Sequence, residues 1–239
     1  IGEANTADER TGKDPAPIGR AARDGLLPLS FPQQQVWFLE QLAPGNIAYH
    51  FQMTLELRGR LDVDALERSF TEIVRGHEIL RTTFHALEGQ PVQRIHPPFP
   101  VAIPRVDLRG IDPDLRDGEA ERRIQAELAA PFDVTRLPLF RLMLFQLEAD
   151  RHLLLQIEHH FVHDGWSIAV LLRELTALYT GFATGAPVTL PELPLQFADF
   201  AAWQHRWFQG ARLERELAWW KERLRDRPPR LELPMDRPR

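Results

Sequence analysis

The sequence has 239 residues, 44% of them hydrophobic and 26% charged, which is enough apolar material for one large domain or two small ones. Its formal net charge is −5 and no basic stripe is present, so we expect no nucleic-acid partner. The chain has no cysteine and its apolar runs are too short to span a membrane, so we expect a cytoplasmic protein without disulfides, thiolate chemistry or a membrane partner.

The first part of the chain divides into a polar segment, a helix, a strand and a second helix. Residues 1–25 mix both charges with Gly and Pro and lack periodicity, which indicates a flexible linker from a preceding domain. Helical patterns cover residues 32–42 and 63–76, and alternation of apolar and polar residues over 51–59 predicts a half-buried strand. Each helix follows a residue suited to cap its N-terminus, Ser30 and Asp62 respectively.

The middle of the chain is expected to supply most of the strands. Segments 79–87 and 91–97 flank a Glu-Gly turn and are predicted to be strands. A helix is predicted over residues 114–130. Segments 139–147 and 152–160 flank a short polar turn and are predicted to form a hairpin, and their nearly continuous hydrophobicity indicates burial on both faces.

Helices dominate the last part of the chain. Helical periodicity covers residues 168–182, 195–208 and 212–224, and the proline-rich residues 226–239 are interpreted as an extended interdomain connector. Strands and helices mixed with hairpins favour an α/β fold. We expect a mixed β-sheet with helices in a two-layer sandwich.

The segment from Glu158 to Ser167, EHHFVHDGWS, concentrates titratable residues at the end of a predicted buried strand. In strand parity, His160 lies on the same face as Leu154 and Glu158. Gly165 suits a tight or left-handed turn before the helix that starts near Ser167. These positions put the His160 imidazole at the mouth of the sheet, where a substrate can reach it.

Asp164 needs a cation if its carboxylate is buried, and Arg81, in a stretch predicted to be a buried strand, is the candidate partner. His163 is interpreted as an ordinary turn residue. A metal site is disfavoured, because His159 and His160 would point to opposite faces of the strand and no cysteine is available. A Ser–His–Asp hydrolase is also disfavoured, since the sequence has no G-x-S-x-G motif.

The motif HHFVHDG, residues 159–165, matches the HHxxxDG signature of the chloramphenicol acetyltransferase-like superfamily. Within it, the chain resembles a condensation domain of nonribosomal peptide synthetases, because further segments that resemble the motifs of that family occur in the expected order. They are LSFPQQQVWFLEQL, GHEILRTTF, FADFAAWQ and LELPMDRPR. The second departs from the family pattern, since Gly76 stands where Arg is usual.

The resemblance also implies how the chain is divided. We expect residues 26–225 to form the N-terminal lobe of a condensation domain, and residues 226–239 to be the connector to a C-terminal lobe that the sequence lacks. The fold implied is a chloramphenicol acetyltransferase-like half-domain, with the active site of the whole domain in a tunnel between two lobes.

The function implied is amide formation between a donor acyl thioester and an acceptor amine. Both would be held on phosphopantetheine arms that belong to carrier proteins, so this chain itself is expected to bind no cofactor. His160 would be catalytic, as a general base, as an orienter of the amine or as a stabiliser of the tetrahedral intermediate. Other motif residues would support the site or line the tunnel: His159, Asp164, Gly165 and Arg81 in the first role, Trp166 and Ser167 in the second.

Two alternative functions stay open. One is a coenzyme A-dependent acyltransferase of the same fold, and the other is a non-catalytic condensation-like module that recruits an enzyme. As a single lobe, the chain is expected to be inactive alone and to self-associate through the exposed face that a second lobe would cover.

Overall fold

The computed structural model describes residues 17–226. The described residues divide into two units, one formed by residues 17–203 and the other by residues 204–226. The expected linker over 1–25 and connector over 226–239 lie mostly outside the described residues.

Residues 17–25 carry no helix and no strand, but they are bonded to the first unit. The Ala21 amide donates to the Asp199 carboxylate at 2.7 Å. The Arg23 guanidinium pairs with the same carboxylate and with Glu78, each at 2.8 Å. These contacts attach the end of the expected linker to the folded unit.

The larger sheet has four strands in the order β2-β7-β6-β5. They are β2 (His50–Arg58), β5 (Arg105–Asp107), β6 (Phe140–Gln146) and β7 (Arg151–His159). The pairs β2–β7 and β6–β7 are antiparallel, whereas β5 runs parallel to β6. The expected mixed sheet and the β6–β7 hairpin are therefore confirmed.

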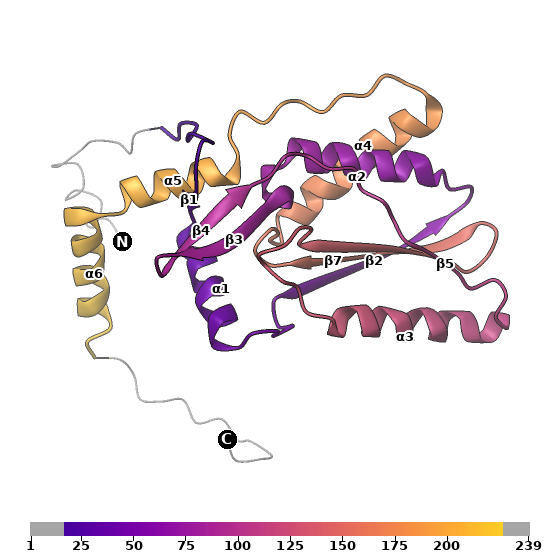
Figure 1. Ribbon diagram of the computed structural model, residues 1–239, viewed down its shortest axis with the longest axis horizontal. Helices are drawn as coiled ribbons and strands as arrows, with labels where there is room; N and C mark the ends of the chain where they lie inside the picture. The colour runs from indigo at the N-terminus through magenta and orange to yellow at the C-terminus, as the bar shows by residue number, and fades with distance from the viewer. Residues whose placement is uncertain (1–16, 227–239) are drawn as a thin grey trace, which may run out of the picture. The chain divides into compact units, whose positions relative to one another are not determined.

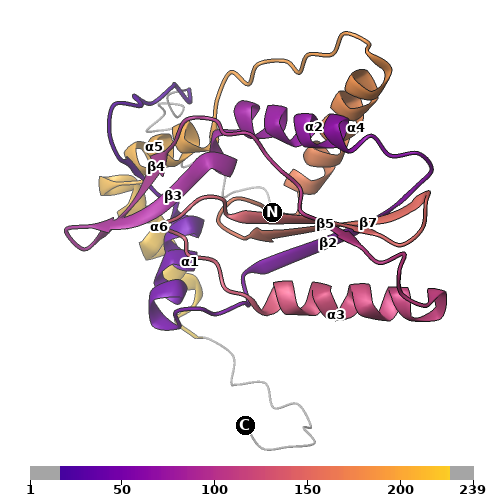
Figure 2. The same cartoon turned by 45° about the vertical axis from the view of Figure 1, so that its right-hand side comes forward.

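Helices cover both faces of this sheet (Figures 1 and 2). α2 (Val63–Gly76) and α4 (Ser167–Thr184) lie on one face, and α3 (Arg116–Ala129) lies on the other. A short 3₁₀ helix, η3 (Pro113–Leu115), leads into α3. The α/β class is confirmed, and around this sheet the layers number three where a two-layer sandwich was expected.

The central strand β7 is buried on both sides, as its apolar sequence predicts. Leu154 belongs to a core cluster with Phe70 of α2 and Leu178 of α4. The next residue, Leu155, faces the other way and belongs to a cluster with Ile124 of α3. Side-chain alternation along β7 thus separates two cores, and the same alternation continues into the residues that follow the strand.

A second sheet, entirely antiparallel, has the strand order β1-β4-β3. Its strands are β1 (Leu27–Pro28), β3 (Thr82–Leu87) and β4 (Gln90–Ile95). A third core cluster contains Leu29, Phe84 of β3 and Phe161, and Trp37 of α1 (Phe31–Leu42) packs against it. Because Phe161 follows β7, this cluster joins the smaller sheet and α1 to the segment that bears the histidine motif.

The prediction of a strand over 79–87 is wrong for its first residues, which form the 3₁₀ helix η2 (Glu78–Arg81). Ile79 and Leu80 are adjacent, yet both pack against the third core cluster, whereas a strand would send them to opposite faces. The Thr82 hydroxyl donates to the Glu78 carbonyl at 2.7 Å and closes the turn.

The predicted helix starts are confirmed. The Ser30 hydroxyl accepts from the Gln33 amide at 3.3 Å, and the Gln33 side chain accepts from the Ser30 amide at 3.0 Å, which forms a capping box at α1. The Asp62 carboxylate accepts from the Ala65 amide at 2.9 Å at the start of α2.

The two C-terminal helices also form as expected, as α5 (Phe197–Trp207) and α6 (Gly210–Arg223). Within residues 17–226, no helix combines the length and the hydrophobicity needed to cross a membrane.

Candidate active site

The histidine motif lies in the turn that connects the end of β7 to the start of α4. β7 ends at His159, and the amide of the next residue, His160, donates to the Tyr49 carbonyl at 2.8 Å. This bond holds the first residue of the turn beside the start of β2. The expected strand end at residue 159 or 160 and the helix start near Ser167 are both confirmed.

His160 is exposed, and its ring has one nitrogen fixed by the backbone. Nδ1 lies 2.9 Å from the carbonyl oxygen of His163. A carbonyl oxygen only accepts, so Nδ1 must carry the hydrogen, and Nε2 of the neutral ring keeps its lone pair. The ring therefore presents a proton acceptor on the side away from the turn.

His159 is 1% exposed and has the opposite tautomer. Its Nδ1 accepts from the Phe161 amide at 3.2 Å, so the hydrogen is on Nε2, which lies 3.3 Å from a carboxylate oxygen of Glu40. Burial lowers the pKa of His159 to about 4, so the ring stays neutral at neutral pH. His159 thus joins the turn to the last turn of α1.

Asp164 is exposed, and its carboxylate is satisfied within the turn. Oδ1 accepts from the Ser167 hydroxyl at 2.6 Å, the Ser167 amide at 2.9 Å and the Trp166 amide at 3.1 Å. The bond from the Ser167 hydroxyl is the main cause of the lowered pKa of Asp164. The carboxylate holds the first amides of α4, as an N-cap does.

The expected ion pair between Asp164 and Arg81 is wrong. Arg81 donates to the carbonyl oxygen of His96, and its nearest carboxylate is that of Glu78 at 4.0 Å. The physical reason is that the Asp164 carboxylate takes its hydrogens from the turn itself and remains in solvent, so it needs no buried cation. Burial lowers the pKa of Arg81.

The remaining motif residues lie at the surface of the turn. Gly165 does not have the left-handed backbone considered for it, and a Cβ built on it would meet nothing within 4 Å. Trp166 is 84% exposed. Trp166 and Ser167 both line a cavity beside the turn. Their contact with substrate stays a prediction.

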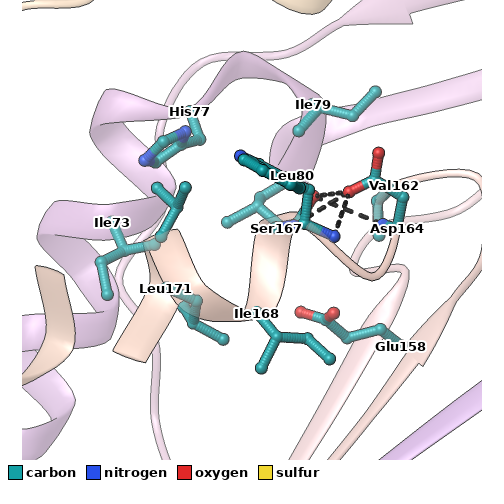
Figure 3. Close-up of a pocket in the computed structure, with 12 residues that line it drawn as sticks. Ile73, His77, Ile79, Leu80, Glu158, Val162, Asp164, Ser167, Ile168 and Leu171 are labelled. Atoms are coloured by element: carbon teal, nitrogen blue, oxygen red, sulfur yellow. Dashed lines mark hydrogen bonds between the residues drawn. The ribbon is translucent and has the colours of Figure 1, made fainter. Parts of the chain in front are cut away.

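Two cavities adjoin the turn. One, of about 500 Å³, is lined by His160, Tyr49 and residues of α1 and α5. The other, of about 350 Å³, lies between the turn and the helices α2 and α4 and contains Glu158 (Figure 3). Val162, Asp164 and Ser167 are among the residues that line both, so the two cavities are neighbours across the turn.

Glu158 had no predicted role, although strand parity placed it on the same face as His160. It is 6% exposed, and burial raises the pKa of its carboxyl to about 7. His163, expected to be an ordinary turn residue, is also buried: its Nδ1 lies 3.3 Å from the Glu158 carboxyl and its ring stacks on Phe51 at 4.3 Å. A polar residue on the apolar face of a strand was the signal that could have found this pair.

Gln33 is a further residue that sequence reasoning did not single out. Its side chain is buried, and besides capping α1 it donates from Nε2 to the Phe161 carbonyl at 3.2 Å. Gln33 belongs to the segment LSFPQQQVWFLEQL, so this family motif contacts the histidine turn directly. Among residues 17–226, no three His, Cys, Asp or Glu side chains gather as metal ligands do.

A sequence profile of the condensation domain matches residues 23–239. The chain belongs to the condensation-domain family. The resemblance inferred from the motifs is thereby confirmed. The match begins at Arg23, whose side chain pairs with Asp199 of α5.

Curated relatives are large synthetases, of which the chain spans a small part. It is 45% identical over 225 residues to Chondramide synthase cmdD of Chondromyces crocatus, covering 94% of this chain and 6% of that protein. It is 41% identical over 228 residues to the Phosphinothricin tripeptide synthetase PhsC of Streptomyces viridochromogenes, covering 95% of this chain and 21% of that protein.

Solved structures similar to the chain are more than one and a half times as long as it is. The first condensation domain of the CDA synthetase superimposes with a TM-score of 0.73 at 30% identity, covering 86% of this chain and 52% of that one. The X-domain in its complex with OxyB from teicoplanin biosynthesis superimposes with a TM-score of 0.81 at 29% identity, covering 95% and 49%. The chain thus corresponds to about half of a solved condensation domain.

Proposed function

We propose that this chain supplies the histidine-bearing half of a domain that joins a donor acyl thioester to an acceptor amine. The observation that carries the proposal is the His160 ring. It is exposed beside a cavity of about 500 Å³, and its Nδ1–H is fixed to the His163 carbonyl, so Nε2 is free to accept a proton.

The reaction needs such an acceptor. An α-amino group has a pKa of about 8, and after its attack on a thioester carbonyl the nitrogen must lose a proton. His160 Nε2 accepts this proton as the new C–N bond forms, and the thiolate leaves with the carrier. General-base assistance of this kind contributes roughly 10²–10⁴-fold to a rate.

The other residues of the turn are positioning residues in this proposal. The backbone bond from His160 to Tyr49 and the neutral His159 fix the ring from one side. Asp164 fixes the start of α4 from the other side. Gly165 leaves open space in which an extended arm of a substrate can pass.

The substrates are proposed to be tethered to phosphopantetheine arms of donor and acceptor carrier proteins, and this chain to bind no cofactor of its own. The second half of a condensation domain would supply the opposite wall of the site. Without that wall we expect self-association through exposed apolar side chains such as Phe38 and Trp166, which sedimentation measures. We propose a cytoplasmic location, which the lack of cysteine supports.

A second candidate function is recruitment of an enzyme without catalysis. It is favoured by the superposition on the X-domain, which is solved in complex with OxyB, over 95% of this chain. The free Nε2 of His160 favours catalysis instead, because a docking surface does not require an oriented proton acceptor.

The test is the substitution His160→Ala in a polypeptide that joins this chain to the second half of a condensation domain. Condensation is followed by mass spectrometry of intact loaded carriers, and we expect a loss of about 10²-fold or more. His85→Ala, in β3 and outside both cavities, is the matched control and should keep full activity. Undiminished product with His160→Ala would remove this residue from the chemistry. Absence of product even from the unsubstituted polypeptide would favour the recruitment function.

A further inference from the structure

The cavity of about 350 Å³ beside the histidine turn has apolar walls, and one of its described residues, Glu158, carries a deeply buried carboxyl. We call it the Glu158 pocket. Its walls come from α2, η2, the turn and the first residues of α4, and their apolar members include Ile73, Ile79, Leu80, Val162, Ile168 and Leu171. Figure 3 shows the Glu158 side chain extending from β7 toward Ile168. Small-molecule sites have this character, with mostly apolar walls and few polar groups.

The Glu158 carboxyl is incompletely paired for a group that is 6% exposed. One oxygen accepts from the Gln156 side chain at 2.7 Å. The other lies 3.3 Å from His163 Nδ1, but among the described residues that nitrogen has no hydrogen-bond partner of acceptable geometry. Burial without a cation is costly for a carboxylate, and it raises the pKa of Glu158 to about 7.

Among the described residues that line the pocket, none is a Lys or Arg that could balance this carboxyl. His77 lines the pocket, but its Nε2 is bonded to Glu174 at 2.6 Å. Asp164 at the rim adds a second carboxylate, one whose pKa is lowered chiefly by the Ser167 hydroxyl. The ionisable groups of the pocket are thus weighted towards acids.

We propose that the Glu158 pocket binds a substrate side chain that has an aliphatic stem and a terminal ammonium group, with Glu158 as the residue that selects the charge. The proposal rests on the proposed function, since it assigns part of a substrate of the same site. The shared wall residues Val162, Asp164 and Ser167 make it possible for one substrate to occupy this pocket and the His160 cavity together.

The chemistry of the walls decides between classes of side chain. An aliphatic stem buries apolar surface against residues such as Leu80 and Leu171. An ammonium group supplies the missing partner of the Glu158 carboxyl, and a charge-assisted hydrogen bond of this type is about twice as strong as a neutral one. A neutral side chain would leave Glu158 without a cation, and a carboxylate side chain would be repelled by Glu158 and Asp164.

The test is a binding measurement on the purified 239-residue chain by amide-resolved NMR titration. The probes are Nα-acetyl-lysine methylamide and Nα-acetyl-norleucine methylamide, which has the same stem without the ammonium group. We expect the lysine probe to bind about tenfold more tightly, with shifts at residues of the pocket such as Val162 and Leu171. Glu158→Gln should abolish this preference while binding of the norleucine probe is kept.

Glu148→Gln is the matched control, because Glu148 is an exposed carboxylate in the turn of the same β6–β7 hairpin. It should leave both affinities unchanged, and melting curves of all three proteins check that each is folded. Equal binding of the two probes to the unmodified chain, or an equal effect of the two substitutions, would overturn the proposal.

The failure of this proposal and the failure of the proposed function can be told apart. In a condensation assay with a joined second half, His160→Ala should lower product with every substrate. Glu158→Gln should instead lower product only with substrates that carry an ammonium side chain. Equal binding of the two probes to the unmodified chain, together with loss of product in the His160→Ala variant, would reject the pocket assignment alone.

Discussion

His159 and His160 are adjacent in the chain and carry their hydrogens on opposite ring nitrogens. His159 accepts at Nδ1 from the backbone and is closed inside the protein, where burial lowers its pKa to about 4. His160 uses Nδ1–H to hold the turn and leaves Nε2 towards solvent. The alternation of side chains along β7 produces this division, because it sends one ring inwards towards Glu40 and the other out at the strand end.

Glu158 and His159 should affect stability in opposite directions as pH changes. Glu158 has a folded-state pKa of about 7 against an unfolded value of 4.5, so its contribution is full below pH 4.5 and is lost as pH rises to about 7. His159 has a folded-state pKa of about 4 against 6.5, so its contribution is full above pH 6.5 and is lost as pH falls to about 4. In the unmodified chain, these two opposite dependences of stability on pH partly cancel.

We therefore predict that Glu158→Gln changes the pH dependence of unfolding. Relative to the unmodified chain, the variant should gain about 3 kcal/mol of stability between pH 4.5 and about 7, because it no longer buries an ionising carboxyl. Urea unfolding followed by circular dichroism at a series of pH values measures this. A constant difference across the series would show that Glu158 ionises normally in the folded protein.

Arg81 and Asp164 should act independently, since the structure gives them different partners. A double-mutant cycle with Arg81→Ala and Asp164→Asn is expected to give a coupling free energy below about 0.5 kcal/mol. Arg23→Ala with Asp199→Asn is the positive control, because these side chains pair at 2.8 Å and Asp199 is 1% exposed. A coupling as large as that of the control would restore the ion pair first expected from the sequence.

At the scale of elements, family motifs that are far apart in sequence contact either the histidine turn or the segment 17–25. Gln33 of α1 donates to the carbonyl of Phe161. Ile79 of η2 lines both cavities. Asp199 of α5 holds the segment that contains Ala21. Each motif thus has a positional reason that the sequence alone could not supply, because each depends on a partner elsewhere in the chain.

Two helical glycines are expected to respond to alanine in opposite ways, because only Gly181 of α4 lies close to another segment of the chain. A Cβ on Gly181 would overlap the Val188 side chain and lie 3.3 Å from the Ala186 carbonyl. Gly181→Ala should therefore destabilise the fold by roughly 1–3 kcal/mol. Gly118→Ala, in α3 with nothing within 4 Å, should stabilise it by up to about 1 kcal/mol. Melting temperatures of both variants, compared with the unmodified chain, decide whether this approach is as close as described.

The elements that sequence predicted well are those with a cap or a long periodic pattern. Ser30 and Asp62 mark the starts of α1 and α2, and the apolar run of β7 implied its burial on both faces. The strands β1 and β5 were missed because Leu27–Pro28 and Arg105–Asp107 are too short to show alternation. The turn η2 was missed because its apolar residues resemble the start of β3.

At the scale of the whole molecule, the position of His160 followed from one strand and one motif, whereas the Glu158 pocket did not. Its walls come from α2, η2, β7 and α4, and local sequence patterns do not predict how these elements pack together. A family resemblance carries the shared motif, but it does not say which residues of other elements pack around Glu158. The site was therefore predictable where it depends on one hairpin, and unpredictable where it depends on several elements.

The relation of this chain to solved condensation domains leads to a last prediction. It covers 52% of one such chain and 49% of another, and its His160 ring is exposed beside an open cavity. Holding two substrates in attack geometry can contribute about 7–11 kcal/mol to lowering a barrier, and that positioning needs walls on both sides. We expect the purified 239-residue chain to be folded by circular dichroism, yet to form no amide from loaded donor and acceptor carriers.

The same chain joined to the second half of a condensation domain should form product, and His160→Ala in that polypeptide is the negative control. Product from the 239-residue chain alone would show that this half by itself positions both substrates.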